Sequence, residues 1–259
     1  MSTGLSVAAT GMTAQQINID TIANDLANVN TPGYKMGTAE FKDLFYQIIK
    51  PAGQTTASGG QIPVGIALGM GTELACIRKD FSQGDYRNTG NELDWAIEGQ
   101  GFFKVTHNEE EIYVRSGNFK LDSEGYVCTA EGDRLQPEVN VSSNTTSITI
   151  DSSGHLVGFG PGNIEAVSAD IKLYKFPNPA GLQPMGGNLY RTTPASGEAS
   201  EGAPGIDGFG SISQGFLEMS NVDVVNKMVE MIVAQRTYES CSKVIKTEDA
   251  MLQVASNLR

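Results

Sequence analysis

The sequence predicts an α+β protein with long N- and C-terminal helices that pair as a coiled coil and with a β-rich middle domain. Apolar residues recur at heptad spacing near the N-terminus, a second helical pattern fills the C-terminus, and short apolar runs separated by turn residues lie between them. The 30 glycines and 10 prolines in 259 residues fit a middle region built of short strands and many turns.

The N-terminal helix is predicted within residues 1–33. One heptad position holds Leu5, Met12, Ile19 and Leu26, and the position three residues later holds Ala8, Gln15, Ile22 and Val29. The only charged side chains before Lys35 are Asp20 and Asp25, so we expect protein to bury this helix on most sides. The helix should end near Asn30, because the residue before Pro32 is disfavoured in the α region.

Charge, hydropathy and cysteine content exclude several classes of protein. The net charge of −12 argues against nucleic acid or an anionic membrane as a partner. The N-terminal region has no long apolar stretch and no secretory-signal pattern, so we expect neither membrane insertion nor a cleaved signal peptide. Cys76, Cys128 and Cys241 fit no disulfide framework or zinc site and are interpreted as buried, unreactive thiols.

Residues 34–72 are predicted to connect the first helix to the middle domain. Apolar side chains recur at helical spacing within residues 38–50, which favours a short amphipathic helix or turn; they are Phe41, Leu44, Phe45 and Ile48. Residues 51–60 are rich in small polar residues and are predicted to form an extended loop. The Gly69-Met70-Gly71 triplet lacks a following helix, so it does not indicate a nucleotide site.

The β-rich domain is predicted over residues 73–205. We expect strands at residues 73–81, 93–97, 101–106, 111–115 and 166–176, with a hairpin turn at 107–110. An Asp-Ser-x-Gly turn occurs twice, at 122–125 and at 151–154, each between apolar runs. Residues 177–210 are predicted to be a loop, and 206–219 a returning connector.

The C-terminal helix is predicted within residues 220–259. Ser220 and Asp223 have the spacing of a capping box. An approximate heptad stripe follows, made of Val225, Met228, Ile232, Gln235, Ser242, Ile245, Leu252 and Ala255. Acidic residues precede basic ones by four positions in the pairs Asp223–Lys227 and Glu239–Lys243. A helix over 222–257 would be about 54 Å long, which favours a coiled coil or an assembly over one compact domain.

Both ends of the chain resemble bacterial flagellar rod and hook proteins. The resemblance is carried by residues 22–35 at one end and by 220–225 and 231–239 at the other. The family-motif positions are Ala23, Asn24, Leu26, Ala27, Asn28, Thr31, Gly33, Tyr34, Lys35, Ser220, Asn221, Val222, Gln235, Arg236 and Tyr238. Residues 41–47 and 93–103 look like the distal-rod members of this family. Asp25 and Tyr34 depart from it, since the family often has Asn and Phe there.

The resemblance implies a structural subunit that polymerises into a tube and transmits torque as a drive shaft. It implies terminal helices lining the tube, an outward β domain, and contacts with copies of itself, proximal rod subunits and the hook protein. It also implies surrounding ring proteins, type III export without a cleaved signal peptide, and a place in the basal body of the cell envelope. Residues 46–63 occupy the place of an insertion associated with a straight, stiff rod. We expect assembly contacts at Leu5, Met12, Ile19, Ile22, Leu26, Val29, Val225, Met228, Ile232, Ile245 and Leu252.

Two other functions are weighed against this one. A proximal rod or hook subunit is the close alternative, although hook proteins are longer. A β-rich enzyme acting on the cell wall is the distant one, and its best carboxylate pair would be Asp94 and Glu98. The two histidines, His107 and His155, lie in no catalytic or metal-binding motif. We therefore expect no catalytic residue, no cofactor and no metal.

Overall fold

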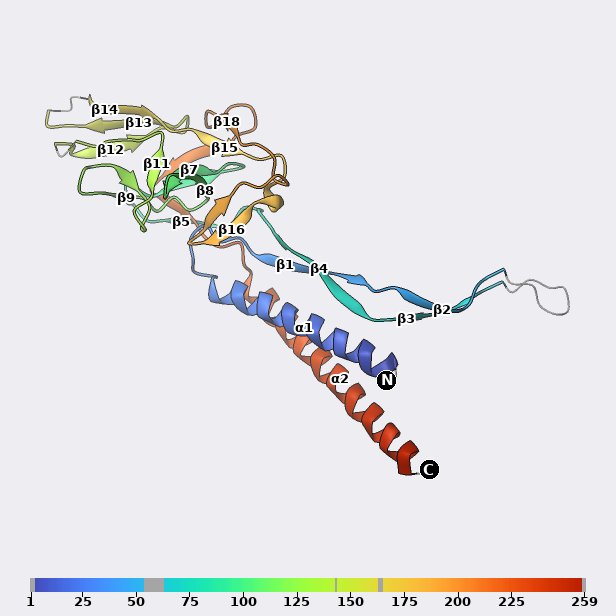
Figure 1. Cartoon of the computed structure of the whole chain (residues 1–259). Coiled ribbons are helices and arrows are strands. Elements are labelled where there is room, and N and C mark those ends of the chain that lie inside the picture. The colour runs from blue at the N-terminus through green and yellow to red at the C-terminus, as the bar shows by residue number, and fades with distance from the viewer. Residues whose placement is uncertain (1–2, 54–62, 143, 163–164, 258–259) are drawn as a thin grey trace. The chain divides into compact units, whose positions relative to one another are not determined.

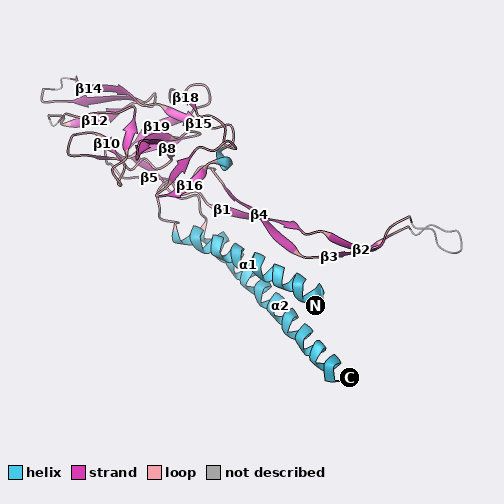
Figure 2. Cartoon of the chain, viewed as in Figure 1, coloured by secondary structure: helices cyan, strands magenta, loops and turns pink. Residues whose placement is uncertain are grey.

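A computed structural model describes residues 3–53, 63–142, 144–162 and 165–257. The chain divides into two compact units. The helical unit comprises residues 1–27, 37–78 and 223–259, and the β unit comprises 28–36 and 79–222. The α+β class is confirmed, with a helix near each end and strands between (Figure 2). The division into five segments that the sequence predicts, from the N-terminal helix to the C-terminal helix, remains a prediction.

The helical unit contains α1 (Thr3–Ala27) and α2 (Val224–Asn257), which pack against each other (Figure 1). Helix α1 ends three residues before the expected Asn30. The N-cap of α2 is Asp223, whose carboxylate accepts hydrogen bonds from the backbone N–H groups of Val225 and Asn226 at 2.9 and 3.3 Å. The predicted capping box, with Ser220 as the N-cap, is therefore wrong, because Asp223 is itself the N-cap residue.

A two-stranded ribbon completes the helical unit. β1 (Gly37–Asp43) pairs with β4 (Thr72–Lys79), and β2 (Tyr46–Lys50) pairs antiparallel with β3 (Ile66–Gly69). The short helix expected within 38–50 is wrong. A ribbon without a buried face shows no alternation of apolar and polar residues, so its apolar residues matched helical spacing by coincidence. Most of the expected loop at 51–60 lies outside the described residues.

The β unit is built on a seven-stranded sheet in the order β16-β17-β8-β7-β11-β10-β9. Its strands are β7 (Phe103–His107), β8 (Glu110–Val114), β9 (Lys120–Leu121), β10 (Val127–Cys128), β11 (Arg134–Gln136), β16 (Gln183–Gly186) and β17 (Leu189–Arg191). A three-stranded sheet consists of β12 (Ser147–Ile150), β13 (His155–Phe159) and β14 (Glu165–Asp170). Three further pairs are β5 (Tyr86–Asn88) with β20 (Phe216–Glu218), β6 (Trp95–Glu98) with β19 (Ser211–Gln214), and β15 (Leu173–Lys175) with β18 (Ser200–Gly202).

The main core of the β unit surrounds three aromatic rings. Trp95 and Phe103 are fully buried, and the Phe119 ring lies 5.1 Å from the Trp95 ring and 5.2 Å from the Phe103 ring, between centroids. Phe102 belongs to a second buried cluster with Tyr113 and Phe176. Trp95, Phe102 and Phe103 are therefore core residues of the β unit.

The two repeated turns have the predicted structure. Gly125 and Gly154 have φ angles of 82° and 83°, a region that favours glycine. In each turn the glycine N–H donates to the aspartate carbonyl, at 2.9 Å to Asp122 and 2.8 Å to Asp151. The β7–β8 hairpin is also confirmed, with Asn108 in its turn at positive φ. The same local chemistry therefore closes similar hairpins at two places in the chain.

Two segments contain more structure than the sequence indicated. The expected loop at 177–210 includes a short 3₁₀ helix, η1 (Pro179–Gly181), and strands β16, β17 and β18, and the expected connector at 206–219 includes β19 and β20. These strands are three or four residues long, and apart from the β16–β17 hairpin they pair with strands distant in sequence, so periodicity could not identify them. The prediction of buried cysteines holds for Cys128 but is wrong for Cys76, which is exposed.

Candidate assembly surface

Three contacts define how α1 and α2 pack in the helical unit. A Cβ placed on Gly4 would lie 2.7 Å from Glu248 Oε1, and one on Gly11 would lie 3.3 Å from Cys241 Sγ. Asp25 Oδ2 lies 3.2 Å from Lys227 Nζ. Each step of 7 or 14 residues along α1 is matched by an equal step backwards along α2. The helices are therefore antiparallel and in one register, with Gly4 and Gly11 of α1 facing the side chains of Glu248 and Cys241 of α2.

The face of α2 that meets α1 differs from the stripe predicted from the sequence. Lys227 and Ala234 are buried, whereas Val225, Met228 and Ile232 are exposed. On α1, Ala8 and Ile22 are buried and the column of Leu5, Met12, Ile19 and Leu26 is only half-buried. Val29 and Ile245 are half-buried and Leu252 is exposed. A role of these positions in assembly remains a prediction, as does coiled-coil geometry.

The exposed side of α2 carries an apolar face at its N-terminal end. The face consists of Val225, Met228, Val229, Ile232 and Val233, which are between 54 and 71% exposed. Their spacing of i, i+3, i+4, i+7 and i+8 places them on one side of a helix. An apolar stripe of this kind is usually covered by protein, so this face is a candidate assembly surface.

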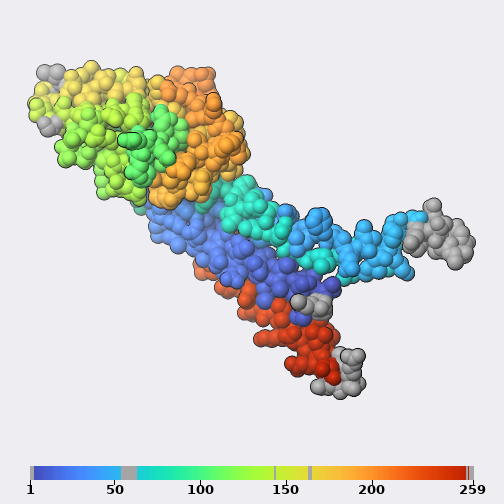
Figure 3. All heavy atoms as spheres, in the orientation of Figure 1, coloured from blue at the N-terminus to red at the C-terminus, as the bar shows by residue number. Residues whose placement is uncertain are grey.

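The ribbon also has exposed apolar side chains, and its light-blue atoms extend beyond the two helices in the space-filling view (Figure 3). Phe45 is 92% exposed, and every residue of β2 and β3 is exposed. Neighbouring residues of a strand point to opposite faces, so Tyr46 and Ile48 lie on one face of the ribbon, and Leu68, which pairs with Gln47, lies on the other. A two-stranded ribbon is marginally stable alone in water, so the exposed end of this ribbon is a second candidate assembly surface.

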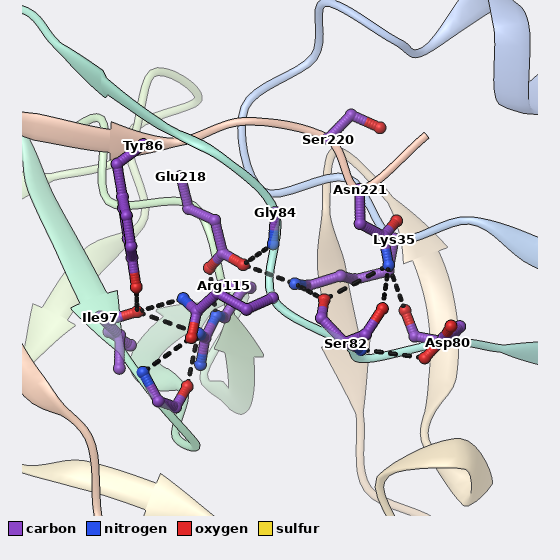
Figure 4. A network of polar contacts seen from close by, with 12 residues as sticks. Lys35, Asp80, Ser82, Gly84, Tyr86, Ile97, Arg115, Glu218, Ser220 and Asn221 are labelled. Atoms are coloured by element: carbon purple, nitrogen blue, oxygen red, sulfur yellow. Dashed lines mark hydrogen bonds and ion pairs between the residues drawn. The ribbon is translucent and has the colours of Figure 1, made fainter. Parts of the chain in front are cut away.

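A buried charge cluster lies in the β unit (Figure 4). The Glu218 carboxylate lies 2.6 Å from Lys35 Nζ through one oxygen and 2.6 Å from Arg115 Nε through the other. The Gly84 N–H donates to the same carboxylate at 3.0 Å. Burial alone would raise the pKa of Glu218, but the Arg115 and Lys35 cations outweigh it and hold that pKa below its usual value. Burial lowers the pKa of Lys35. The nearby Glu218 carboxylate raises it again, but only in part, so the pKa stays below its usual value.

The same cluster brings the two family motifs together. Asn221 Oδ1 accepts the Met36 N–H at 2.8 Å, and its amide donates to the Asp80 carbonyl at 3.0 Å. The Gly33 N–H donates to the Glu218 carbonyl at 2.8 Å. Gly33 has a φ of 73°, and a Cβ there would lie 2.7 Å from the Ser116 nitrogen. The segments that follow α1 and precede α2 are thus joined within the β unit.

The other motif residues are divided between packing and exposure. Tyr34, Lys35, Ser220 and Val222 are buried, and Lys79 Nζ lies 4.4 Å from the centre of the Tyr34 ring. Leu26, Asn28 and Thr31 are half-buried, and Thr31 Oγ1 donates to Asn28 Oδ1 at 3.2 Å. The exposed motif positions are Ala23, Asn24, Ala27, Gln235, Arg236 and Tyr238. Arg236 pairs with Glu239 at 3.2 Å, in place of the predicted Glu239–Lys243 pair.

Sequence reasoning missed four charged residues in these sites. It treated Asp25 as a family departure, whereas Asp25 is fully buried, lies beside Lys227 and accepts the Gly37 N–H at 2.9 Å. It paired Lys227 with Asp223, but Lys227 lies beside Asp25 and Glu230. Arg115 and Glu218 were not considered. A usable signal was present for Asp25, since it is one of only two charged residues in the first helix.

The carboxylates considered for an enzyme do not form a paired site. Asp94 is buried and accepts a hydrogen bond from the Asn91 amide, while Glu98 is exposed and accepts one from Ser213. His107 and His155 each contact an aspartate, Asp133 and Asp170 respectively. Across the described residues, no group of three or more potential ligands could hold a metal ion. Neither described helix combines the length and hydropathy needed to cross a membrane.

Comparison with models of known protein families shows the class of protein to which the chain is similar. Residues 5–35 match the family model "Flagella basal body rod protein", and residues 96–158 match "Flagellar hook protein FlgE/F/G D1 domain". Residues 213–258 match "Flagellar basal body rod FlgEFG protein C-terminal". All three describe structural rod and hook proteins, in agreement with the prediction that the chain is not an enzyme.

Sequence identity to full-length relatives shows the family to which the chain belongs. The chain is 43% identical to the flagellar basal-body rod protein FlgG of Borreliella burgdorferi over 100% of this chain and 99% of the relative. It is 42% identical to FlgG of Caulobacter vibrioides over 98% of each chain. The flagellar hook protein FlgE of Salmonella typhimurium is 24% identical, over 98% of this chain and 99% of the hook protein. The chain belongs to the family of flagellar basal-body rod proteins.

Proposed function

We propose that the chain is a structural subunit of the flagellar basal body that polymerises into the distal rod, the drive shaft that transmits torque from motor to hook. The observation that carries the proposal is the large apolar surface of the helical unit, on α2 and on both faces of the ribbon. Burial of an exposed valine or isoleucine contributes roughly 1.5–3 kcal/mol, so contacts between copies can hold a durable polymer. Torque transmission needs stiffness and no catalytic site.

The position of the subunit in the flagellum follows from the family. We infer that α1 and α2 form a coiled coil lining the tube, and that the polymer joins proximal rod subunits to the hook protein. Ring proteins would surround it in the cell envelope, and the type III apparatus would export the chain without cleaving a signal peptide. The higher identity to rod proteins than to the hook protein favours the rod over the hook.

Electron microscopy of the concentrated full-length protein tests the proposal. We expect straight tubes from the full chain and none from a chain of residues 28–222, which lacks both long helices. Circular dichroism should show that the shorter chain keeps its β structure. Tubes from the shorter chain, or a full chain that stays monomeric at every concentration, would contradict the proposal.

The ribbon gives the rod its stiffness in our proposal. Residues 46–63 include β2 and the place of the rod-type insertion, and the described part of this segment is exposed. Deletion of 46–63 should leave a polymer that bends, which the persistence length of imaged tubes measures. A straight, rigid polymer from the deletion variant would sink this idea.

A further inference from the structure

A small cavity in the β unit is lined by three cationic side chains, those of Lys35, Arg115 and Lys175. Its volume is about 80 Å³, and the rest of its lining consists of phenylalanine and proline side chains and the segment from Gly99 to Gly101. No acidic residue of the described chain lines it. Because the whole chain has a net charge of −12, this local excess of cations is opposite to the average charge of the molecule. A lining of this kind favours an anion as the occupant.

The two buried cations of the cavity have hydrogen-bond donors to spare (Figure 4). A lysine ammonium has three N–H donors and an arginine guanidinium has five. Lys35 Nζ donates to the Ser82 carbonyl and to the Glu218 carboxylate, both at 2.6 Å. Arg115 donates one N–H to Glu218 and three to the backbone carbonyls of Ile97, Gly99 and Gly101. Within the part of the chain that the structure describes, one N–H of each cation is left for another acceptor.

Lys175 supplies the third positive charge. It is half-buried, and its ammonium makes no hydrogen bond or ion pair with any residue that the structure describes. Two acids act on the other cations: Glu218 lies against Lys35 and Arg115, and the charge of Asp80 acts on Lys35. Three cations thus face two carboxylates. A charge without a partner is unfavourable where water is largely excluded, so an anion in the cavity would complete the cluster.

The volume of the cavity limits the size of the anion. A water molecule takes up about 30 Å³ in the liquid, so 80 Å³ corresponds to two or three waters. Sites for drug-sized ligands are roughly 300–1,000 Å³, which excludes a sugar or a nucleotide here. A chloride ion or the carboxylate of an acetate ion is of suitable size. Gly99 and Gln100 line the cavity and are exposed, so an ion can enter from solvent.

We propose that this cavity binds a small monovalent anion, chloride or a carboxylate of acetate size, between Lys35, Arg115 and Lys175. The three residues come from separate segments of the β unit, so the anion ties these segments together. An ion that binds only the folded chain stabilises it. The inference does not rest on the proposed function, since it concerns the β unit alone.

Chloride NMR of the full-length protein tests the site, because exchange with a protein site broadens the chloride signal. Lys175→Gln should remove most of the broadening that the wild type causes. Lys120→Gln is the matched control, since it removes the same charge from an exposed position outside the cavity and should keep the broadening. Acetate added to the wild type should displace chloride and narrow the signal. Equal broadening by the two variants would overturn the proposal, and broadening that acetate leaves unchanged would overturn its carboxylate part.

Urea unfolding of the wild type gives a second measurement that needs no variant. At constant ionic strength, replacement of a bulky sulfonate buffer anion by chloride should raise the unfolding midpoint of the β unit. The rise should persist in Lys120→Gln and be lost in Lys175→Gln, whose β structure circular dichroism checks. A wild-type midpoint that is the same in both salts would contradict the anion site.

Discussion

The two units of the chain differ in where their apolar residues lie. In the β unit Trp95 and Phe103 are fully buried by the chain itself, whereas in the helical unit Phe45 is 92% and Val225 71% exposed. Burial of apolar surface is the main source of folding free energy, so the β unit contains its own stabilisation. The helical unit leaves part of that surface exposed, and our proposal places the contacts with other copies there. One chain would then combine a domain that buries its own core with a unit that mediates assembly.

The largest expected change in stability is in the β unit, which buries its own apolar core. Trp95→Ala should lower the free energy of unfolding of the β unit by roughly 3–5 kcal/mol, because it leaves a cavity among buried rings. Urea unfolding followed by tyrosine fluorescence and circular dichroism measures the change. A loss below about 1 kcal/mol would show that the aromatic core is not the principal stabilising feature.

The buried charge cluster should come next. Glu218→Gln leaves the Lys35 and Arg115 cations without their carboxylate, and such a loss costs roughly 3 kcal/mol or more. Glu73→Gln is the control, since its pair with Lys42 is solvent-exposed and its loss should not change the unfolding midpoint measurably. Equal midpoints for the two variants would show that the cluster contributes no stability.

The same cluster predicts loss of stability in acid. The pKa of Glu218 lies below its ordinary value of 4.5 in the folded chain, so the folded state binds fewer protons than the unfolded state. The contribution should be complete above pH 4.5 and should fall as the pH drops through the folded pKa. Unfolding midpoints of the wild type and Glu218→Gln should converge in this acidic range. A constant difference between them down to about pH 2 would contradict the assignment.

A smaller effect on stability is expected in the pair of α1 and α2, where a disulfide tests the register of the two helices. Gly11→Cys should form an intramolecular disulfide with Cys241, since a Cβ at Gly11 lies 3.3 Å from the Cys241 sulfur. Ala8→Cys and Gln15→Cys, about one turn to either side, are register controls and should cross-link poorly. Mass spectrometry of non-reduced peptides reads the result. Preferred linkage from either control would mean that the helices pair in another register.

The smallest effect on the single chain is expected in the ribbon. Phe45→Ala should change monomer stability by less than about 0.5 kcal/mol, because the side chain is exposed, yet it should raise the concentration needed for polymerisation. Light scattering against protein concentration measures that threshold. An unchanged threshold would remove Phe45 from the assembly surface.

The success of sequence reasoning differed between elements for physical reasons. The two long helices and the repeated Asp-Ser-x-Gly turns depend on local chemistry, and the structure confirms them. The ribbon was misread as a helix because both of its faces are exposed, which removes the alternation that identifies a strand. The predicted stripe of α2 follows its most apolar side, while the side facing α1 carries Lys227, Ala234 and Cys241.

The sequence by itself determined the α+β class, the helix at each end and the family, because these reside in periodicity, turn residues and contiguous motifs. Only the tertiary structure decided which residues meet across long separations. It placed Asp25 beside Lys227, gathered Lys35, Arg115 and Glu218 into one cluster, and turned the apolar face of α2 outwards. Such contacts depend on how elements far apart in the chain are positioned relative to each other. The local sequence pattern of one element does not determine that position.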